Sequence, residues 1–237
     1  MYMRKINQLD TGLEFRVGSI LIFFGNQNSN YKFLHDQYSK ILFKRIKQVH
    51  GNDIVAVDQS TPDCQFRADA LISSEENIGL CISTADCLPI FFFNSDRTII
   101  AGVHSGWRGV ALNLVSKVIQ NFQSQGVLPK DLHCFIGPHI SQEYFEIGQD
   151  AFDILQSAAA QVGSSDMFYA KKNEKYFFDL DLLTRYQCQK LGVLEENIFS
   201  LNMDTFSDRQ FHSYRRDKEK AGRQISFIVR LSDQPPK

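Results

Sequence analysis

The amino-acid sequence predicts an α/β domain built around a mixed β-sheet with a layered core. Short strand-like runs outnumber amphipathic helical segments, and some neighbouring runs lie too close in sequence for a crossover helix between them. The run Phe91-Phe92-Phe93 is apolar at every position, which predicts a strand buried on both faces. We therefore expect a mixed sheet instead of a purely parallel one.

Nine short runs rich in β-branched and aromatic residues are predicted to be strands. They lie at residues 20–24, 41–46, 54–57, 70–72, 80–82, 89–93, 99–103, 132–136 and 225–229. No linker, repeat or low-complexity segment separates these runs. We therefore expect one domain over residues 1–237, with a frayed polar tail at residues 232–237.

Three segments have the residue spacing of amphipathic helices. The strongest has a stop signal at Gly126 and one apolar face, formed by Val110, Leu114, Val115, Val118, Ile119 and Phe122. Weaker patterns cover residues 149–161 and 180–191, the second with Asp179 as its N-cap and Gly192 after its end. These helices are expected to interrupt the strands and to cover the sheet.

Composition and charge exclude several classes of function. The formal net charge of −1 removes the electrostatic argument for nucleic-acid binding. No apolar run approaches the ~20 residues that cross a bilayer, so no membrane association is expected. The five cysteines are scattered and odd in number, and the first residues lack the apolar core of an export signal. Reduced thiols and a cytoplasmic location are expected.

Reactive side chains collect at the ends of three predicted strands. The sequences there are KQVHG (residues 47–51), STADCLP (residues 83–89) and VHSGWRG (residues 103–109). Loops at strand ends converge over a rigid sheet, where α/β proteins commonly gather their binding groups. The three segments are therefore candidates for a common site.

His50, Cys87 and His104 are candidates for one transition-metal site, best interpreted as zinc. A thiolate and two imidazoles provide three ligands and leave a fourth position open, which is typical of catalytic zinc. Two other interpretations stay open. The three residues can be structural, because no close spacing such as C-x-x-C links them. Alternatively, Cys87 is a nucleophile activated by His104, with Asp86 as the orienting carboxylate.

Arginines near the same motifs are candidates for anion binding. Arg108 lies between Gly106 and Gly109 at the start of a predicted helix, where a guanidinium and free backbone N–H groups suit a phosphate. The pocket is expected to receive further groups from Arg215, Arg216 and His139. The simpler interpretation is a set of exposed arginines and a loop histidine without a role.

Together with three further segments, these motifs identify a known family. The further segments are ADA (residues 68–70), IGP (136–138) and FHSYRRD (211–217). The chain resembles the laccase-domain, or polyphenol oxidase, family, which is also called the purine nucleoside phosphorylase or peptidoglycan editing factor family. The resemblance spans about residues 17–230. Residues 139–148 and 203–205 depart from the family pattern. These departures are expected to alter the pocket wall and therefore the substrate preference.

The resemblance implies a single layered domain of the α/β/β/α type and zinc ligands at His50, Cys87 and His104. It implies phosphorolysis of adenosine, inosine, guanosine and methylthioadenosine, with deamination of adenosine as a second activity. The expected partners are small purine nucleosides and phosphate, and the expected assembly is a monomer or small homo-oligomer.

In the expected mechanism, Arg108 and one of Arg215 and Arg216 bind phosphate beside the metal. Candidates for orienting hydroxyl groups or transferring a proton are Lys47, Gln48 and Asp86. Two rival activities are a copper-dependent polyphenol oxidase and a cysteine amidase that acts on cell-wall peptides through Cys87. A multicopper centre, however, needs more histidines than the six that this chain contains.

Overall fold

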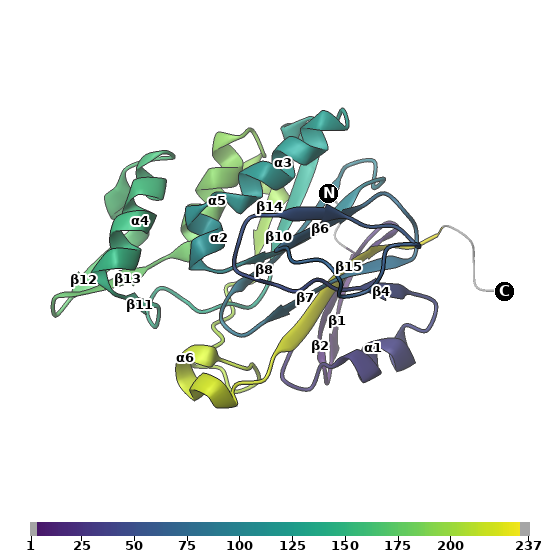
Figure 1. Ribbon diagram of the computed structural model, residues 1–237, viewed down its shortest axis with the longest axis horizontal. Coiled ribbons are helices and arrows are strands. Elements are labelled where there is room, and N and C mark those ends of the chain that lie inside the picture. The colour runs from purple at the N-terminus through teal and green to yellow at the C-terminus, as the bar shows by residue number, and fades with distance from the viewer. Residues whose placement is uncertain (1–3, 233–237) are drawn as a thin grey trace.

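A computed structural model describes residues 4–232 and shows two six-stranded sheets packed face to face (Figure 1). The first sheet has the order β1-β2-β3-β15-β7-β4. Its strands are β1 (Arg4–Leu9), β2 (Gly12–Val17), β3 (Ile20–Gly25), β4 (Leu42–Lys44), β7 (Ile78–Thr84) and β15 (Gln224–Arg230). The second sheet has the order β14-β10-β8-β9-β6-β5. Its strands are β5 (Ile54–Ala56), β6 (Ala70–Ser73), β8 (Leu88–Asn94), β9 (Ile100–Ser105), β10 (Leu132–Ile136) and β14 (Ile198–Ser200).

Helices cover the outer faces of both sheets. The second sheet is covered by α2 (Trp107–Ala111), α3 (Leu114–Ser124) and α5 (Leu180–Lys190), and the first sheet by α1 (Tyr31–Gln37). At one end of the molecule, α4 (Gln149–Ala160) packs near a small sheet of β11 (Glu146–Ile147), β13 (Lys175–Phe178) and β12 (Tyr169–Lys172) (Figure 1). The remaining short helices are η1 (Pro129–Asp131), η2 (Ser165–Phe168), η3 (Glu195–Asn197), α6 (Tyr214–Asp217) and η4 (Lys218–Lys220).

The layered, mixed fold predicted from sequence is confirmed. Strand β8 shows the reason, because Phe91 and Phe93 face the core between the sheets and Phe92 faces the core under the helices. All three phenylalanines are buried. Each six-stranded sheet combines parallel and antiparallel pairs; in the first sheet, for example, β4 is parallel to β7 and β15 is antiparallel to it.

Several elements differ from the sequence predictions. The expected helix over residues 110–122 is two helices, α2 and α3, because Asn113 adopts a left-handed conformation (φ 52°) that interrupts the helical backbone. The strand predicted over residues 41–46 contracts to β4. Helices α4 and α5 agree with prediction within one residue, and Asp179 caps α5 by accepting a hydrogen bond from the Leu182 N–H.

The hydrophobic patterning missed other elements, including β1, β2, α1 and the β11-β13-β12 sheet. Their strands and helix are short or half-exposed, and their apolar periodicity is correspondingly weak. Within residues 4–232, none of the helices has the length and apolar character needed to cross a membrane. The tail expected to fray lies outside the described residues from position 233 onward.

Candidate metal centre and substrate cavity

The three motifs converge because of the way β7, β8 and β9 are connected. Cys87 lies in the turn between β7 and β8, and His104 lies near the end of β9. The antiparallel pairing of β8 with β9 sets Pro89 opposite His104, so the turn that carries Cys87 lies beside the histidine. The loop that follows β4 supplies His50. Three distant segments therefore reach one edge of the paired sheets.

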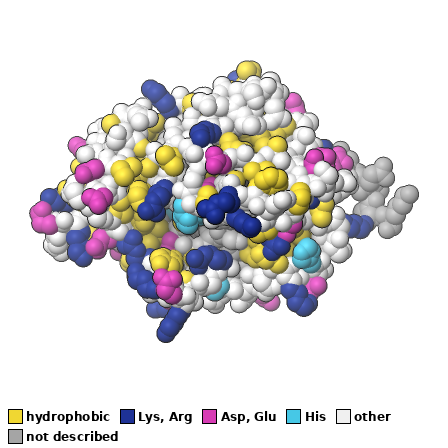
Figure 2. All heavy atoms as spheres, viewed as in Figure 1, with side chains coloured by type: hydrophobic (Ala, Val, Ile, Leu, Met, Phe, Trp, Pro, Cys, Tyr) yellow, Lys and Arg dark blue, Asp and Glu magenta, His cyan; other side chains and the backbone are white. Residues whose placement is uncertain are grey.

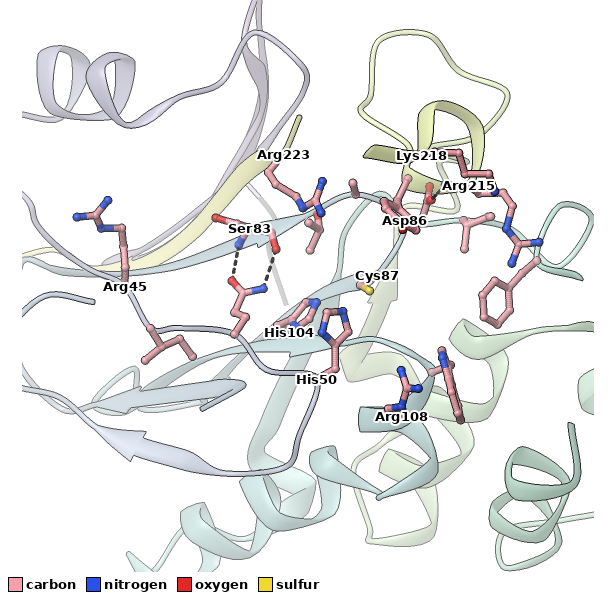
Figure 3. Close-up of a pocket in the computed structure, with 18 of the residues that line it drawn as sticks. Arg45, His50, Ser83, Asp86, Cys87, His104, Arg108, Arg215, Lys218 and Arg223 are labelled. Carbon is pink, nitrogen blue, oxygen red and sulfur yellow. Dashed lines mark hydrogen bonds between the residues drawn. The ribbon is translucent and has the colours of Figure 1, made fainter. Parts of the chain in front are cut away.

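The potential ligand atoms of His50, Cys87 and His104 all lie within 4.8 Å of one another. Figure 3 shows the three side chains, called the metal trio below, pointing toward a common point. The two imidazole rings meet edge to face, with centroids 4.7 Å apart. His104 is buried, whereas His50 is exposed. One thiolate and two imidazoles form a donor set that suits zinc or copper, so the cluster can bind a metal.

Gly106 makes this close approach possible. A Cβ atom at position 106 would lie 2.9 Å from the Cys87 sulfur and 3.1 Å from Cδ2 of His50. Any larger residue would therefore push two members of the metal trio apart. This close packing explains why the VHSGWRG motif has a glycine directly after the strand that supplies His104.

Asp69 connects the two histidines of the metal trio. Its carboxylate is completely buried just before β6 and accepts hydrogen bonds from the backbone N–H groups of Val49, His50 and Gly51, the last at 2.6 Å. It also accepts a 2.8 Å hydrogen bond from Nδ1 of His104. Nε2 of His104 is consequently the nitrogen that faces Cys87 and can bind a metal, and His50 is held in a left-handed conformation (φ 58°).

Charge interactions within the metal trio favour a thiolate. Burial raises the pKa of the Cys87 thiol, but attraction to His104 and hydrogen bonds from both histidines outweigh burial and lower this pKa to about 6. Burial lowers the pKa of His104, whereas the Cys87 thiolate and Asp69 raise it to about 9. Burial also raises the pKa of Asp69, but the hydrogen bonds that it accepts hold its pKa below the usual value. Thiolate is the form that binds metals and attacks electrophiles.

The metal trio opens into a large cavity of about 1140 Å³. Figure 2 shows Lys and Arg side chains gathered around this hollow. The predicted residues that line it are Gln48, His50, Asp86, Cys87, His104, Arg108 and Arg215. Lining residues outside the motifs include Tyr31, Arg45, Phe145, Glu146, Lys218 and Arg223.

Gln48 and Asp86 both line the cavity, and their side chains hold neighbouring segments in place. The Gln48 side chain donates to the Ser83 carbonyl and accepts from the Ser83 N–H, which ties the loop after β4 to β7 (Figure 3). Asp86, at φ 84°, accepts one hydrogen bond from the Thr205 hydroxyl at 2.7 Å and another from the Arg215 N–H at 2.6 Å. Both side chains therefore position chain segments around the cavity.

The two predicted arginines of the FHSYRRD motif have different surroundings. Arg215 lines the cavity beside the Phe145 ring and donates to the carbonyls of Tyr144 and Glu146. Arg216 donates to the carbonyls of Thr205, Phe206 and Phe211 and pairs with Asp217. Arg216 is absent from the lining of the cavity, and its donors fold the surrounding loop.

Arg108 stacks over the ring of Trp107, with its guanidinium carbon 4.4 Å from the ring centroid. Because α2 has only five residues, its N-terminus adds little to anion binding, and the Arg108 side chain is the main donor there. The other two predicted pocket residues, Lys47 and His139, are not among the lining residues. His139 is buried, with Nδ1 hydrogen-bonded to the Gly137 carbonyl. The backbone of Lys47 pairs with that of Arg67 in an isolated β-bridge.

Asp69 is the main site residue that the sequence reasoning left without a role. It lies directly before the predicted strand at residues 70–72, and that position beside a strand was the available signal. The partners of Asp69 are mostly backbone N–H groups, which leave no trace in the amino-acid sequence. The lining residues Lys218 and Arg223 gave no signal either, since charged residues are common in exposed loops.

Known proteins are similar to this chain in sequence and in fold. Residues 26–231 match the family described as multi-copper polyphenol oxidoreductase laccase. The purine nucleoside phosphorylase YfiH of Escherichia coli (strain K12) is 32% identical over 184 residues, which cover 77% of this chain and 72% of that protein. A purine nucleoside phosphorylase of Campylobacter jejuni is 31% identical over 233 residues, covering 92% and 93%. The crystal structure of a hypothetical protein YfiH from Bacillus licheniformis, 22% identical, has a TM-score of 0.87 and covers 97% of this chain and 100% of that chain.

Proposed function

Because the chain belongs to the multi-copper polyphenol oxidoreductase laccase family, we propose that it is a zinc-dependent purine nucleoside phosphorylase. Its proposed substrates are adenosine, inosine, guanosine and methylthioadenosine, each cleaved by phosphate into the base and a sugar 1-phosphate. Deamination of adenosine is proposed as a second activity of the same site. Relatives of about the same length that are named purine nucleoside phosphorylases support this assignment.

The observation that carries the proposal is the combination of groups in one cavity. The metal trio opens into the same space as Arg108 and Arg215, and the rings of Trp107 and Phe145 lie beside these arginines. These groups suit phosphorolysis: cations can bind phosphate, a flat apolar surface can bind a base, and the centre can stabilise negative charge. No other described cavity combines them.

Arg108 and Arg215 bind phosphate in this proposal. Arg108 has no carboxylate partner within the described residues, so its guanidinium is available to a ligand. Arg215 donates two hydrogen bonds to the carbonyls of Tyr144 and Glu146. Its main contribution to phosphate binding is therefore its positive charge. A zinc ion bound by the metal trio would supply Lewis-acid stabilisation of negative charge.

The remaining predicted residues orient the site. Gln48 and Asp86 hold the loops that frame the cavity, so that the phosphate and the nucleoside meet in a fixed geometry. Asp86 also lines the cavity, where its carboxylate can accept a hydrogen bond from a ribose hydroxyl. The three residues that lie outside the lining, Lys47, His139 and Arg216, support neighbouring segments in this scheme.

The test uses the full chain loaded with one zinc ion and incubated with adenosine, with and without phosphate. We expect adenine and ribose 1-phosphate only when phosphate is present, and inosine in both conditions. Cys87→Ala is expected to lose zinc and both activities, whereas Cys64→Ala is a control that leaves the metal trio intact. Zinc-loaded protein that forms neither adenine nor inosine would overturn the proposed function.

One observation favours a second candidate, a cysteine amidase that acts on cell-wall peptides. The lowered pKa of Cys87 and the contact with His104 provide a thiolate and a proton donor, as in cysteine hydrolases. The two candidates differ in what they require of the thiolate. Reaction of Cys87 with an electrophilic substrate analogue while zinc remains bound supports the amidase, and protection of Cys87 by zinc supports the phosphorylase.

The copper-dependent polyphenol oxidase is distinguished by metal content. The donor set of the metal trio suits a single copper ion as well as zinc, but within the described residues it is the one cluster able to hold a metal. Metal analysis of protein purified without added copper, followed by a phenol oxidation assay, separates the two. Stoichiometric zinc without oxidation of phenols is the expected result.

A further inference from the structure

The cavity carries more positive charge than one inorganic phosphate ion balances. Its lining contains five cationic side chains, although the chain as a whole has a net charge of −1. These cations are Arg45, Arg108, Arg215, Lys218 and Arg223. Figure 2 shows Lys and Arg side chains gathered around a hollow on this face of the molecule. Concentrated charge of one sign in a cleft attracts ligands of the opposite sign.

Few carboxylates within the described residues offset these cations. Arg45 pairs with Asp63, with Nε 2.7 Å from the carboxylate. The two carboxylates in the lining are Asp86, which accepts from Thr205 and the Arg215 N–H, and Glu146, which pairs with Lys175. Among residues 4–232, no carboxylate lies within 4.0 Å of the other four lining cations. Four cations thus face the single unpaired carboxylate of Asp86, and a bound phosphate brings at most two negative charges.

The arrangement of the cations separates them into two groups. In Figure 3, Arg108 and Arg215 lie on one side of the metal trio, and Arg223 lies on another side, above His104 and near Ser83. Arg223 donates only to the carbonyls of Ala221 and Gly222 in its own loop. A phosphate held by Arg108 and Arg215 therefore leaves Arg223 without an anionic partner.

Unused polar groups lie next to Arg223. Thr84 is among the lining residues, and its hydroxyl is buried without a hydrogen-bond partner. Thr84 is the cross-strand partner of Gln224, the neighbour of Arg223, and the Gln224 side-chain nitrogen is also buried without a partner. Buried polar groups are almost always hydrogen-bonded in native proteins. Of these two groups only Thr84 belongs to the lining, and its unpaired hydroxyl is a group that a ligand at this wall can complete.

The cavity also has space for a second anionic group. Its volume of about 1140 Å³ exceeds the roughly 300–1,000 Å³ of ordinary small-molecule sites. A nucleoside and an inorganic phosphate bound near the metal trio would leave the Arg223 end empty. A substituent on the 5′-oxygen, the exocyclic oxygen of the ribose, extends away from the anomeric carbon and can reach such an end.

We propose that the cavity binds nucleoside 5′-phosphates, with the ester phosphate at Arg223 and Thr84 and the inorganic phosphate at Arg108 and Arg215. This inference rests on the proposed phosphorolysis and defines its substrate class. In the reaction, an oxygen of inorganic phosphate forms a bond to the anomeric carbon while the glycosidic C–N bond breaks. The base leaves with the electron pair and takes up a proton. The sugar product is ribose 1,5-bisphosphate.

The test compares adenosine 5′-phosphate with adenosine on the zinc-loaded full chain in the presence of phosphate. We expect kcat/KM for the 5′-phosphate to be at least about tenfold higher, which corresponds to one charge-assisted hydrogen bond. Mass spectrometry should detect ribose 1,5-bisphosphate. In Arg223→Gln the ratio of the two kcat/KM values should fall toward one. Arg209→Gln, an exposed arginine outside the lining, should keep the wild-type ratio.

The outcomes separate this inference from the proposed function. If adenosine is cleaved but its 5′-phosphate is cleaved no better, the inference is overturned while the phosphorylase assignment stands. A preference for the 5′-phosphate that persists in Arg223→Gln also overturns the placement of the ester phosphate. If neither compound is cleaved, the phosphorylase assignment fails. The proposed binding site is then tested by calorimetry, which compares the affinities for adenosine and its 5′-phosphate. Tighter binding of the 5′-phosphate that is lost in Arg223→Gln then supports the site, and equal binding refutes it.

Discussion

The two sides of the cavity are held in place by different kinds of interaction. On the metal side, defined as loop 47–51, Asp69 and His104, one fully buried carboxylate accepts three backbone hydrogen bonds and one from a metal-trio imidazole. On the cationic side, defined as Asp86 and segment 204–217, side chains contact backbone groups of partly exposed loops.

The charged side chains therefore have different functions on the two sides of the cavity. On the metal side, the carboxylate fixes ligand atoms directly, so a change there should alter metal binding. On the cationic side, Asp86 and Arg216 fix the path of a segment that carries Arg215. Changes there should alter stability or substrate binding and leave the metal trio intact. Four substitutions test this contrast.

The largest effect is expected for Asp69→Asn. An amide cannot accept from four donors as a carboxylate does, and it turns its own N–H groups toward some of them. Loss of a carboxylate partner of a metal-binding histidine typically lowers metal affinity 10–100-fold. The free energy of unfolding should fall by roughly 3 kcal/mol. Zinc affinity is measured by competition with a chelator, and ligand geometry by the absorption spectrum of the cobalt-substituted protein.

Asp179→Asn is the matched control for this change. Asp179 is a partly buried carboxylate that, like Asp69, accepts from a backbone N–H, but it caps α5 and is not among the residues around the metal trio. Asparagine is about as good an N-cap as aspartate, so neither zinc affinity nor the cobalt spectrum should change. If Asp69→Asn retained wild-type zinc affinity, the role of Asp69 in orienting the two histidines would be refuted.

Arg216→Gln should have the next largest effect, on stability alone. The guanidinium donates to the carbonyls of Thr205, Phe206 and Phe211 at 2.7–2.9 Å, and a glutamine amide can replace only part of these bonds. We expect the free energy of unfolding, measured with urea, to fall by roughly 2 kcal/mol. The zinc affinity should stay within about twofold of wild type. A large loss of zinc affinity would show that the two sides of the cavity are coupled.

Asp86→Asn should have a smaller effect that appears in substrate binding. Asparagine tolerates the positive φ of this position, but its amide accepts from only one of the Thr205 hydroxyl and the Arg215 N–H. The segment that carries Arg215 is then held less firmly. We expect KM for phosphate to rise about tenfold, equivalent to one lost hydrogen bond, with little change in kcat. A fall in kcat at unchanged KM would instead assign the Asp86 carboxylate to the reaction itself.

The two sides also differ in how far sequence could predict them. The strands β7, β8 and β9 have strong apolar runs, so the ends that carry Cys87 and His104 were predictable. His50, Cys87 and His104 belong to residue types whose chemistry restricts their use, and their predicted convergence is confirmed.

The cationic side was less predictable because arginines are common in both loops and sites. Sequence placed Arg215 and Arg216 together, but adjacent residues in a short helix point in different directions, and only Arg215 lines the cavity. Arg223 follows a loop without any pattern. Likewise, the single predicted helix over 110–122 is broken by the left-handed Asn113, a backbone conformation that apolar periodicity does not encode.

The smallest effect, and the one that measures burial most directly, is expected for Asp204→Asn. Like Asp69, Asp204 accepts backbone hydrogen bonds, here from Ser141 at 2.8 Å and Ser207 at 2.7 Å, but it is partly exposed. Burial raises the pKa of Asp204, and the hydrogen bonds from Ser207 and Ser141 outweigh it and hold the pKa below 3.8. At neutral pH the substitution should cost only about 0.5–1 kcal/mol, since solvent screens the carboxylate.

The stabilisation by the Asp204 carboxylate should depend on pH in a definite direction. A carboxylate whose folded pKa is lowered stabilises the protein above its unfolded pKa and loses that contribution as the pH falls through the folded value. The difference in unfolding free energy between wild type and Asp204→Asn should therefore be constant from pH 7 to 5 and shrink below about pH 4. Urea unfolding at pH 7, 5 and 3.5 measures it. A cost as large as that of Asp69→Asn would mean that hydrogen-bond number, and not burial, sets the contrast between the two sides.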